Sequence, residues 1–371
     1  MRKKIAIIFA YLENNLGDDI FVQLLCKRYP EADFYVAQPR VHNVSLSALP
    51  NLYFSKEMKK LDAAFDEKVV SKDVQKYYSQ FDACVVIGGS IFMQNSNMWR
   101  RQVIRFKNRL AVSKHLYVIG ANWGPFTDNN FLSEYSPLFE KTSDICFRDL
   151  DSTSYFHNIS SIRYAPDVLL TYGNVHADSE NKVVISLIDS LWAGRPKEQY
   201  VELKAHSSEY ENLLFDVCKE FSDMGYKICL MSFCQTQKDD AAAVRLQERC
   251  VEAGIYGVDT FSYTGDIDSA IHELASAKYI IATRFHSMIL GWLFNKPTFP
   301  IIYDNKQRTV IKDINFPNKY CFLKRIGNIS AKDVVLSLQN YISFDRNDYI
   351  EKAQNQFKGL DAFMKGEKNV R

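Results

Sequence analysis

Short apolar runs alternate with longer amphipathic segments along most of the chain. Such runs lie within residues 4–10, 33–37, 82–90, 115–126 and 144–152 in the first half, and within residues 182–188, 226–232, 255–258 and 279–282 in the second. Each run has the length of a strand that is buried on both faces, and helical periodicity marks the segments between them. This alternation predicts an α/β protein built on parallel sheets.

A polar, turn-rich stretch at residues 171–182 separates two series of predicted strands and helices. The chain has 371 residues, 47% of them hydrophobic, which is enough apolar material for two cores. We therefore predict two doubly wound, Rossmann-like domains, residues 1–175 and 176–345, that face each other across a cleft. The amphipathic residues 348–364 predict a last helix, within a segment 346–371 that crosses back to the first domain.

Charge and cysteine usage narrow the class of protein. A formal net charge of +2 argues against a protein that coats nucleic acid. The eight cysteines are scattered through apolar runs without a C-x-x-C pair, which favours reduced thiols in a cytoplasmic protein. The first apolar run is too short for a signal sequence, and none reaches the length of a bilayer span. We expect a cytoplasmic protein with at most peripheral contact at the inner face of the membrane.

The strongest candidate for chemistry is the segment 277–306, whose pattern predicts a strand, a sharp turn, a helix and a strand. Arg284 and His286 fall in the turn, at the carboxyl end of the strand and the amino end of the helix. Free N–H groups and the helix dipole favour an anion there. Arg284 adds a permanent cation, and His286 adds a group that titrates near neutrality. The alternative is a structural ion pair beside a hydrogen-bonded histidine.

Polar residues also follow the other predicted strands of the first half. They are Asn15, Gly17 and Asp18 after the first strand, Gly89 and Ser90 at the end of the run 82–90, Asn122 towards the end of the run 115–126, and Arg148 at the end of the strand within 144–152. Such strand ends meet at one edge of an open parallel sheet, where these sheets bind ligands. Asp18 also fits a simple helix cap, and the glycines complete no nucleotide-binding fingerprint. No cluster has metal-ligand spacing, so we expect no obligatory metal.

Taken in order along the chain, these motifs resemble those of the polysaccharide pyruvyl transferase family. They are N-x-G-D-D at residues 15–19, G-G-S at 88–90, Arg148-Asp149 with Ser152, Pro166-Asp167, Arg284-Phe285-His286-Ser287 with Pro297, and Tyr303-x-x-Lys306. The resemblance implies a glycosyltransferase-B-like fold, with phosphoenolpyruvate as donor and a sugar or lipid-linked oligosaccharide as acceptor. Many family members have an arginine at the end of the strand that opens the second domain, where this chain has Asp189.

The resemblance also implies roles for individual residues. It places donor binding at Arg284 and proton transfer at His286, which suits a planar guanidinium and a histidine in ketal formation. Three further residues are candidates for donor binding, namely Arg148 in the first domain, which we expect to be the acceptor side, and Ser287 and Lys306 in the second, which we expect to be the donor side. Lys306 fits a solvated surface lysine equally well. Asp18 is a candidate for orienting or deprotonating the acceptor. The residues expected to line the acceptor side are Asn15, Gly17, Gly89, Ser90 and Asn122.

Two other classes of function fit the same pattern. A nucleotide-sugar glycosyltransferase or epimerase on this scaffold would bind a nucleoside diphosphate and not phosphoenolpyruvate. A non-catalytic polysaccharide-assembly protein would keep the fold without the chemistry, and Asp189 leaves that alternative open. The interpretation that uses most motifs is a pyruvyltransferase of cell-surface polysaccharide biosynthesis, with phosphoenolpyruvate as co-substrate and no obligatory cofactor.

Overall fold

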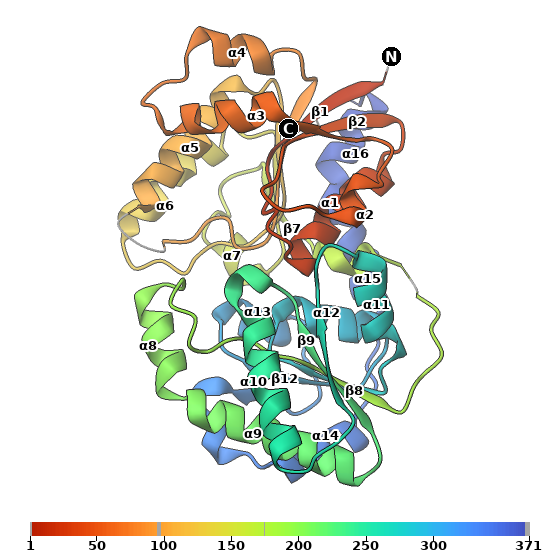
Figure 1. Cartoon of the computed structure of the whole chain (residues 1–371). Helices are drawn as coiled ribbons and strands as arrows, with labels where there is room; N and C mark the ends of the chain where they lie inside the picture. The colour runs from red at the N-terminus through yellow and green to blue at the C-terminus, as the bar shows by residue number, and fades with distance from the viewer. Residues whose placement is uncertain (1, 95–97, 174, 368–371) are drawn as a thin grey trace. The chain divides into compact units, whose positions relative to one another are not determined.

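The computed structural model describes residues 2–94, 98–173 and 175–367, which fold into two compact units (Figure 1). Unit 1 comprises residues 2–12, 18–171 and 349–367, and unit 2 comprises Glu13–Gly17 and the described part of Tyr172–Asp348. Beyond residue 18, the chain leaves unit 1 after Thr171 and returns to it at Tyr349, within a few residues of the predicted bounds at 175 and 345. One segment differs from the prediction: Glu13–Gly17, which we expected in the first domain, packs with unit 2.

Unit 1 is built on a parallel sheet. Its strands are β1 (Lys3–Phe9), β2 (Ala32–Ala37), β3 (Leu52–Ser55), β4 (Ala83–Ile87), β5 (Leu116–Ala121), β6 (Asp144–Phe147) and β7 (Ile162–Tyr164). Their order is β3-β2-β1-β4-β5-β6-β7, so the sheet grows from β1 first in one direction and then in the other. This is the doubly wound order. Every residue of β4 and β5 is buried, as expected for central strands covered on both faces.

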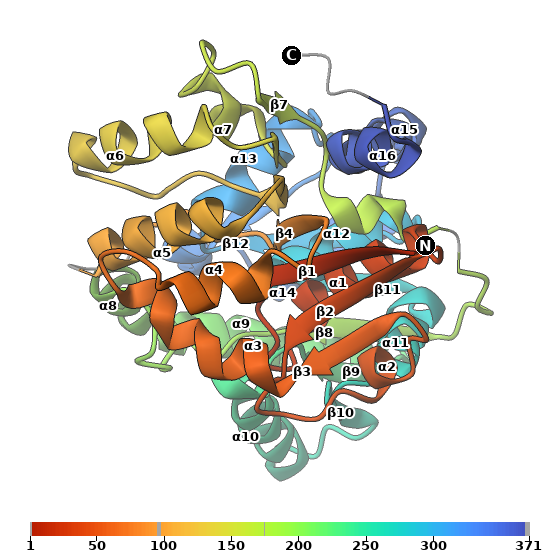
Figure 2. The ribbon, with the colours of Figure 1, turned by 90° about the horizontal axis from the view of Figure 1, so that it is seen from above.

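Helices connect these strands and cover the sheet. In the described residues they are α1 (Leu16–Arg28), α2 (Val44–Ser47), α3 (Lys56–Leu61), α4 (Lys72–Tyr78), α5 (Trp99–Val112), α6 (Asn129–Phe139) and α7 (Leu150–Ser154), with 3-10 turns η1 (Asp62–Asp66) and η2 (Val168–Thr171). Figure 2 shows α3, α4 and α5 gathered to one side of the sheet, apart from the C-terminal helices in blue. Parallel strands need such crossover helices.

An aromatic cluster fixes the loops that follow β4 and β5. Phe92, Trp123, Phe131 and Phe139 are buried; the ring centroids of Trp123 and Phe131 are 4.5 Å apart, and those of Phe92 and Phe139 are 5.0 Å apart. Phe92 also pairs with Trp123 in an isolated parallel bridge. Burial contributes about 1.5–3 kcal/mol for each large side chain, and favourable ring geometry adds to it. The two loops are therefore rigid supports for the polar residues beside them.

The C-terminal segment is broken where the sequence predicted one helix over residues 348–364. It forms α15 (Asn347–Ala353), a 3-10 turn η5 (Gln354–Phe357) and α16 (Lys358–Lys365). The turn places the buried Gln356 so that its amide donates to the carbonyls of Ala165 (2.6 Å) and Pro166 (3.0 Å) and accepts from the N–H of Gly120 (2.9 Å). These long-range hydrogen bonds override the helical period. Residues 368–371 of the predicted segment lie outside the described residues.

Unit 2 repeats the architecture of unit 1. Its strands in the described residues are β8 (Lys182–Ser186), β9 (Lys227–Ser232), β10 (Val258–Ser262), β11 (Tyr279–Ala282), β12 (Thr298–Ile302) and β13 (Cys321–Phe322). They pair in parallel in the order β10-β9-β8-β11-β12-β13, the same doubly wound pattern. The strand predicted at residues 255–258 begins only at Val258. Both units therefore confirm the predicted α/β class with Rossmann-like sheets.

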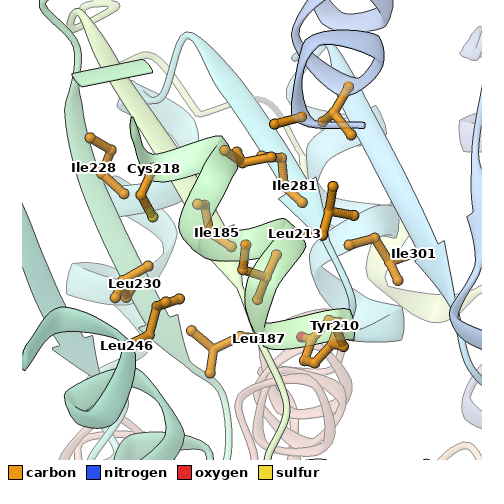
Figure 3. Close-up of a cluster of buried hydrophobic side chains, with 14 of the residues drawn as sticks. Ile185, Leu187, Tyr210, Leu213, Cys218, Ile228, Leu230, Leu246, Ile281 and Ile301 are labelled. Carbon is orange, nitrogen blue, oxygen red and sulfur yellow. The ribbon is translucent and has the colours of Figure 1, made fainter. Parts of the chain in front are cut away.

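The helices of unit 2 pack against this second sheet. In the described residues they are α8 (Lys197–Ala205), α9 (Ser207–Asp223), α10 (Asp239–Glu252), α11 (Ile267–Ser276), α12 (Phe285–Leu293), α13 (Asn305–Asp313) and α14 (Ala331–Gln339), with 3-10 turns η3 (Gln235–Gln237) and η4 (Leu323–Asn328). Figure 3 shows Ile185, Ile281 and Ile301 from three neighbouring strands facing Tyr210 and Leu213 of α9. This apolar layer holds the strand ends, and therefore the loops after them, in fixed positions.

Two further observations concern the whole described chain. All eight cysteines lie in the described residues, and each is a buried thiol outside any disulfide, as predicted for core residues. Among residues 2–94, 98–173 and 175–367, no helix has both the length and the apolarity that crossing a bilayer requires.

Candidate functional site

The strongest candidate site lies in unit 2, where β11 ends and α12 begins. Arg284 occupies the N-cap position of α12 with an extended backbone (φ −73°, ψ 135°), and His286 lies in the first turn. Thr283 and Ser287 on either side are fully buried, so the turn is fixed inside the unit. The first N–H groups of α12 and its dipole favour an anion here. The structure therefore brings a cation and a titratable group to the same helix start.

The Arg284 side chain is buried and held from two sides. One terminal nitrogen donates to Asp239 Oδ1, and the other donates to Gln237 Oε1 at 2.6 Å. Asp239, at the start of α10, also accepts from the N–H of Cys234 at 3.2 Å. Burial lowers the pKa of Arg284, but Asp239 and Tyr303 more than offset this, so the pKa is raised and the guanidinium stays charged. Its Nε is buried without a hydrogen-bond partner among the described residues.

Two other predicted donor-site residues lie close to this turn. Ser287 Oγ donates to the carbonyl of Arg284 at 2.8 Å and also bonds to the serine that ends β8. Lys306, in the first turn of α13, is half-buried, with Nζ 3.8 Å from Asp304 and 5.9 Å from the ring centroid of Phe285. Ser287 therefore supports the turn from within. Lys306 adds a more accessible positive charge, and a donor contact by either residue stays a prediction.

The Glu13–Gly17 segment lies directly against His286. The N–H of Leu16 donates to the carbonyl of Phe233 at 3.1 Å, and Asn15 forms an isolated antiparallel bridge with Cys234. The segment therefore packs against the residues that follow β9. A Cβ atom built on Gly17 would lie 1.6 Å from Nδ1 of His286. Only a residue without a side chain fits there. The backbone of Gly17 therefore packs directly against the imidazole, a contact that the sequence position of either residue does not predict.

Gly17→Ala should displace the His286 ring, because the new methyl group would occupy the space of the imidazole. We expect turnover of the donor to fall by about ten- to a hundredfold, since a shift of about 1 Å in a catalytic group has effects of this size. Steady-state kinetics and a thermal melt measure the two effects separately. Gly327→Ala, at a position with open space around a new Cβ, is the matched control. Unchanged turnover in Gly17→Ala would show that the His286 geometry is irrelevant.

A second group of predicted residues meets in unit 1, at the ends of β4, β5 and β6. Arg148 Nη1 is 3.0 Å from Asp167 Oδ2, and Nη2 donates to Asn122 Oδ1 at 2.8 Å. The side chains of Arg148 and Asp167 are 1% and 0% exposed. Ser90 Oγ donates to Asn122 Oδ1 at 3.3 Å, and a Cβ on Gly89 would lie 2.6 Å from the guanidinium. The structure thus gathers Arg148, Asn122, Ser90 and Gly89 around one buried ion pair.

Asp18, the predicted acceptor base, also lies in unit 1. It is in the first turn of α1 and half-buried, and its Oδ1 lies 3.7 Å from a Cβ built on Gly88. Asp18 is therefore beside the glycine pair that follows β4. Its neighbour Asp19 is buried and accepts from Asn43 Nδ2 at 2.8 Å. The two adjacent acids thus differ in environment, and the one closer to the glycine turn is the one that the sequence singled out.

The Arg148–Asp167 pair should matter strongly for stability. Arg148→Gln leaves a buried carboxylate without its cation, which typically costs about 3–5 kcal/mol. We expect a correspondingly lower midpoint in denaturant unfolding. Arg101→Gln, which removes an exposed arginine from Asp66 while Arg105 still pairs with that carboxylate, is the control and should change the midpoint much less. If both variants unfold alike, the buried pair does not stabilise unit 1, and a direct ligand role for Arg148 gains weight.

Sequence reasoning missed the residues that hold Arg284 in place. Asp239 begins the helix α10, 45 residues before Arg284, and Gln237 lies in the turn just before that helix, 47 residues before Arg284. The acidic pair Asp239-Asp240 at a helix start looks like ordinary capping. A second buried arginine, Arg195, lies in the loop after β8 and was also missed. Its only local signal was its place in a short glycine-containing turn after a predicted strand.

Solved structures of other proteins share the fold. One is the UDP-GlcNAc 2-epimerase of Methanocaldococcus jannaschii in complex with UDP-GlcNAc and UDP: TM-score 0.59, 10% identity, covering 99% of this chain and 100% of that one. Another is Alr3699/HepE of Anabaena in complex with UDP and glucose: TM-score 0.53, 10% identity, covering 99% of each chain. At such low identity these likenesses show the fold alone. They define the class as two Rossmann-like units of the glycosyltransferase-B type.

The chain belongs to the polysaccharide pyruvyl transferase family, whose profile matches residues 15–305. That range contains the candidate site residues named above except Lys306, which lies one residue beyond it. A curated relative, the amylovoran biosynthesis protein AmsJ of Erwinia amylovora, is 23% identical over 277 residues. The match covers 68% of this chain and 65% of that relative. The family resemblance seen in the motifs is therefore confirmed.

Proposed function

We propose that this protein transfers the pyruvyl group of phosphoenolpyruvate onto two hydroxyls of a sugar, as a ketal, during cell-surface polysaccharide biosynthesis. Family membership and the polysaccharide-related relative support the class of reaction. The observation that carries the proposal is Arg284, a buried and permanently charged guanidinium beside His286 at the start of α12. Phosphoenolpyruvate supplies the carboxylate and phosphate that such a site binds.

The proposed chemistry assigns one task to each residue of this turn. Arg284 and the N–H groups of α12 bind an anionic group of the donor. His286 delivers a proton to the enol methylene, and one sugar hydroxyl then attacks the oxocarbenium-like carbon. The second hydroxyl displaces phosphate and closes the ketal. The hydroxyls lose two protons; the new methyl group takes up one, and the other leaves with the released phosphate or to solvent.

Other parts of the proposal rest on the sequence. Asp18 is our candidate for orienting or deprotonating an acceptor hydroxyl, and the acceptor is a sugar or lipid-linked oligosaccharide. We place the reaction in the cytoplasm, with at most peripheral contact at the inner face of the membrane. The steps above use only protein groups and phosphoenolpyruvate. Activity should therefore survive dialysis against a chelator such as EDTA, and loss of activity restored by a divalent ion would contradict this part of the proposal.

Ligand-dependent thermal stabilisation tests the donor assignment. A ligand that binds only the folded protein raises the unfolding midpoint as its concentration rises. We expect stabilisation by phosphoenolpyruvate and little by UDP, GDP or ADP. Stabilisation by a nucleoside diphosphate without any by phosphoenolpyruvate would overturn the proposal in favour of a nucleotide-sugar enzyme. Binding of phosphoenolpyruvate without turnover on any acceptor would point to a protein that retains the site without the chemistry.

A further inference from the structure

A second buried guanidinium in unit 2, that of Arg195, forms no ion pair with a carboxylate of the described residues. Arg195 lies in the loop between β8 and α8, and its side chain stacks near the Trp192 ring, with Cζ 5.1 Å from the ring centroid. Its Nη1 donates to the carbonyls of Asp189 (2.6 Å) and Trp192 (3.2 Å). Its Nη2 is buried with no hydrogen-bond partner among the described residues. A buried cation satisfied only by carbonyls calls for a physical explanation.

Arg195 lies in the same electrostatic environment as Arg284. Burial lowers the pKa of Arg195 and the positive charge of Arg284 lowers it further, while Tyr303, Asp239 and Asp189 raise it only in part. Asp239 and Tyr303 both interact with each of the two arginines. The two guanidinium groups therefore approach the same buried carboxylate, and Asp239 forms its hydrogen bond with Arg284. Arg195 is left as the less compensated of the two cations.

Asp189 offsets only part of the burial of Arg195, and its carboxylate makes its hydrogen bonds elsewhere. Asp189 Oδ1 accepts from the N–H of Leu191 at 3.0 Å and from Arg245 Nη2 at 3.1 Å. Its backbone carbonyl accepts from Arg195, as described above, and from the N–H of Trp192 at 3.2 Å. Asp189 therefore builds the turn that carries Arg195. This position is the one at which the family resemblance leads us to expect an arginine.

The rest of the loop is shaped to bring Arg195 inward. A Cβ on Gly194 would lie 2.2 Å from the Trp192 ring, so glycine lets the ring fold over the turn. Leu191, Ala193 and Gly194 are exposed, whereas Arg195 is buried. The ordered turn thus holds one long cationic side chain inside the unit. Burying a cation carries a desolvation penalty, and an anionic ligand bound at Nη2 would offset part of it.

We propose that Arg195 is the second cation of the donor site, replacing from the loop the arginine that Asp189 displaces from the strand end. The inference rests on the proposed function and names the substrate class more closely: a small molecule with two separate anionic groups. Arg284 binds one group through its unpartnered Nε and the start of α12, and Arg195 binds the other through Nη2. Tyr303 interacts electrostatically with both arginines, which is consistent with two neighbouring subsites.

The test compares Arg195→Gln and Arg195→Lys with the wild type, using isothermal titration with phosphoenolpyruvate, inorganic phosphate and pyruvate. The wild type should bind phosphoenolpyruvate more tightly than either fragment. Arg195→Gln should bind phosphoenolpyruvate about 10- to 100-fold more weakly, the usual effect of losing a hydrogen bond to a charged group. Arg195→Lys should recover only part of the loss. The fragment whose binding also weakens identifies the anionic group at Arg195.

Arg245→Gln is the matched control, because Arg245 is a neighbouring cation on Asp189 whose side chain is 42% exposed. It should leave the affinity for phosphoenolpyruvate nearly unchanged. The ligand-free Arg195→Gln protein should melt at or near the wild-type temperature, since its cation has no ion-pair partner among the described residues. A large drop in melting temperature with unchanged ligand affinity would overturn the inference, because Arg195 would then be structural.

The experiment separates this inference from the proposed function. If phosphoenolpyruvate fails to bind the wild type, the proposed function is wrong, and inorganic pyrophosphate then serves as a probe with two anionic groups. Weaker pyrophosphate binding by Arg195→Gln alone would still support a second cation at the site. If the wild type binds phosphoenolpyruvate and Arg195→Gln binds it equally well, only the inference fails. Binding of neither probe by the wild type overturns both.

Discussion

Replacing His286 with alanine should lower turnover of phosphoenolpyruvate about a hundredfold or more and leave donor binding nearly intact. A positioned acid/base contributes about that much to a rate. The imidazole lies in the first turn of α12, half-buried, and against the backbone of Gly17. The ring is therefore supported on one side and partly exposed. The wild-type rate should depend on a group that titrates near neutrality, and that limb of the pH profile should be missing in His286→Ala.

His272→Ala is the control for this variant, because His272 is an exposed histidine on α11 of the same unit. It should keep the wild-type rate and pH profile. His286→Gln adds a second comparison, since glutamine can donate and accept hydrogen bonds but cannot titrate. Normal turnover with an unchanged pH profile in both His286 variants would show that another group delivers the proton.

Arg284→Lys should weaken binding of the donor on the order of a hundredfold while the protein still folds. Lysine keeps the positive charge beside Asp239, so the buried carboxylate is not left alone. It cannot reproduce a planar group that contacts Asp239 and Gln237 with two nitrogens and leaves Nε for a ligand. Titration with phosphoenolpyruvate and a thermal melt measure the two effects. Wild-type affinity, or a variant that simply unfolds, would make Arg284 a structural residue.

Asp239→Asn is the companion variant to Arg284→Lys. It removes the carboxylate that orients Arg284 without touching the arginine itself, so the guanidinium keeps its charge and loses its fixed position. We expect Asp239→Asn to bind phosphoenolpyruvate more weakly than the wild type. Asp239 is buried and acts through Arg284, so it is a positioning residue. Both Asp239→Asn and Arg284→Gln leave one buried charge without its ion-pair partner, so a thermal melt must accompany each binding measurement.

The sequence alone was enough to locate the main turn. A short apolar run, an abrupt polar stop and a helical stripe are local patterns, so they placed Arg284 and His286 at a strand end and helix start. Repetition of that alternation also predicted two doubly wound sheets, which the strand orders confirm. These features follow from apolar side chains that recur with the period of a strand, 2.0 residues, or of a helix, 3.6 residues.

The remaining features depend on contacts between distant residues. Nothing near Asp239 or Arg195 in the sequence points to Arg284, because the fold brings them together. The transfer of Glu13–Gly17 to unit 2 and the break in the C-terminal helix at Gln356 likewise come from long-range hydrogen bonds. Such pairings carry no periodic signal, so a single sequence does not reveal them.

The central claim is tested most directly by incubating the protein with phosphoenolpyruvate and a panel of synthetic or lipid-linked hexosides. Released phosphate and the mass of each sugar are then followed together. We predict one phosphate released for each sugar modified, a mass gain equal to pyruvic acid minus one water, and both changes slowed about a hundredfold or more with His286→Ala. Phosphate release without a modified sugar, or sugar modification that requires a nucleoside diphosphate donor in place of phosphoenolpyruvate, would contradict the central claim.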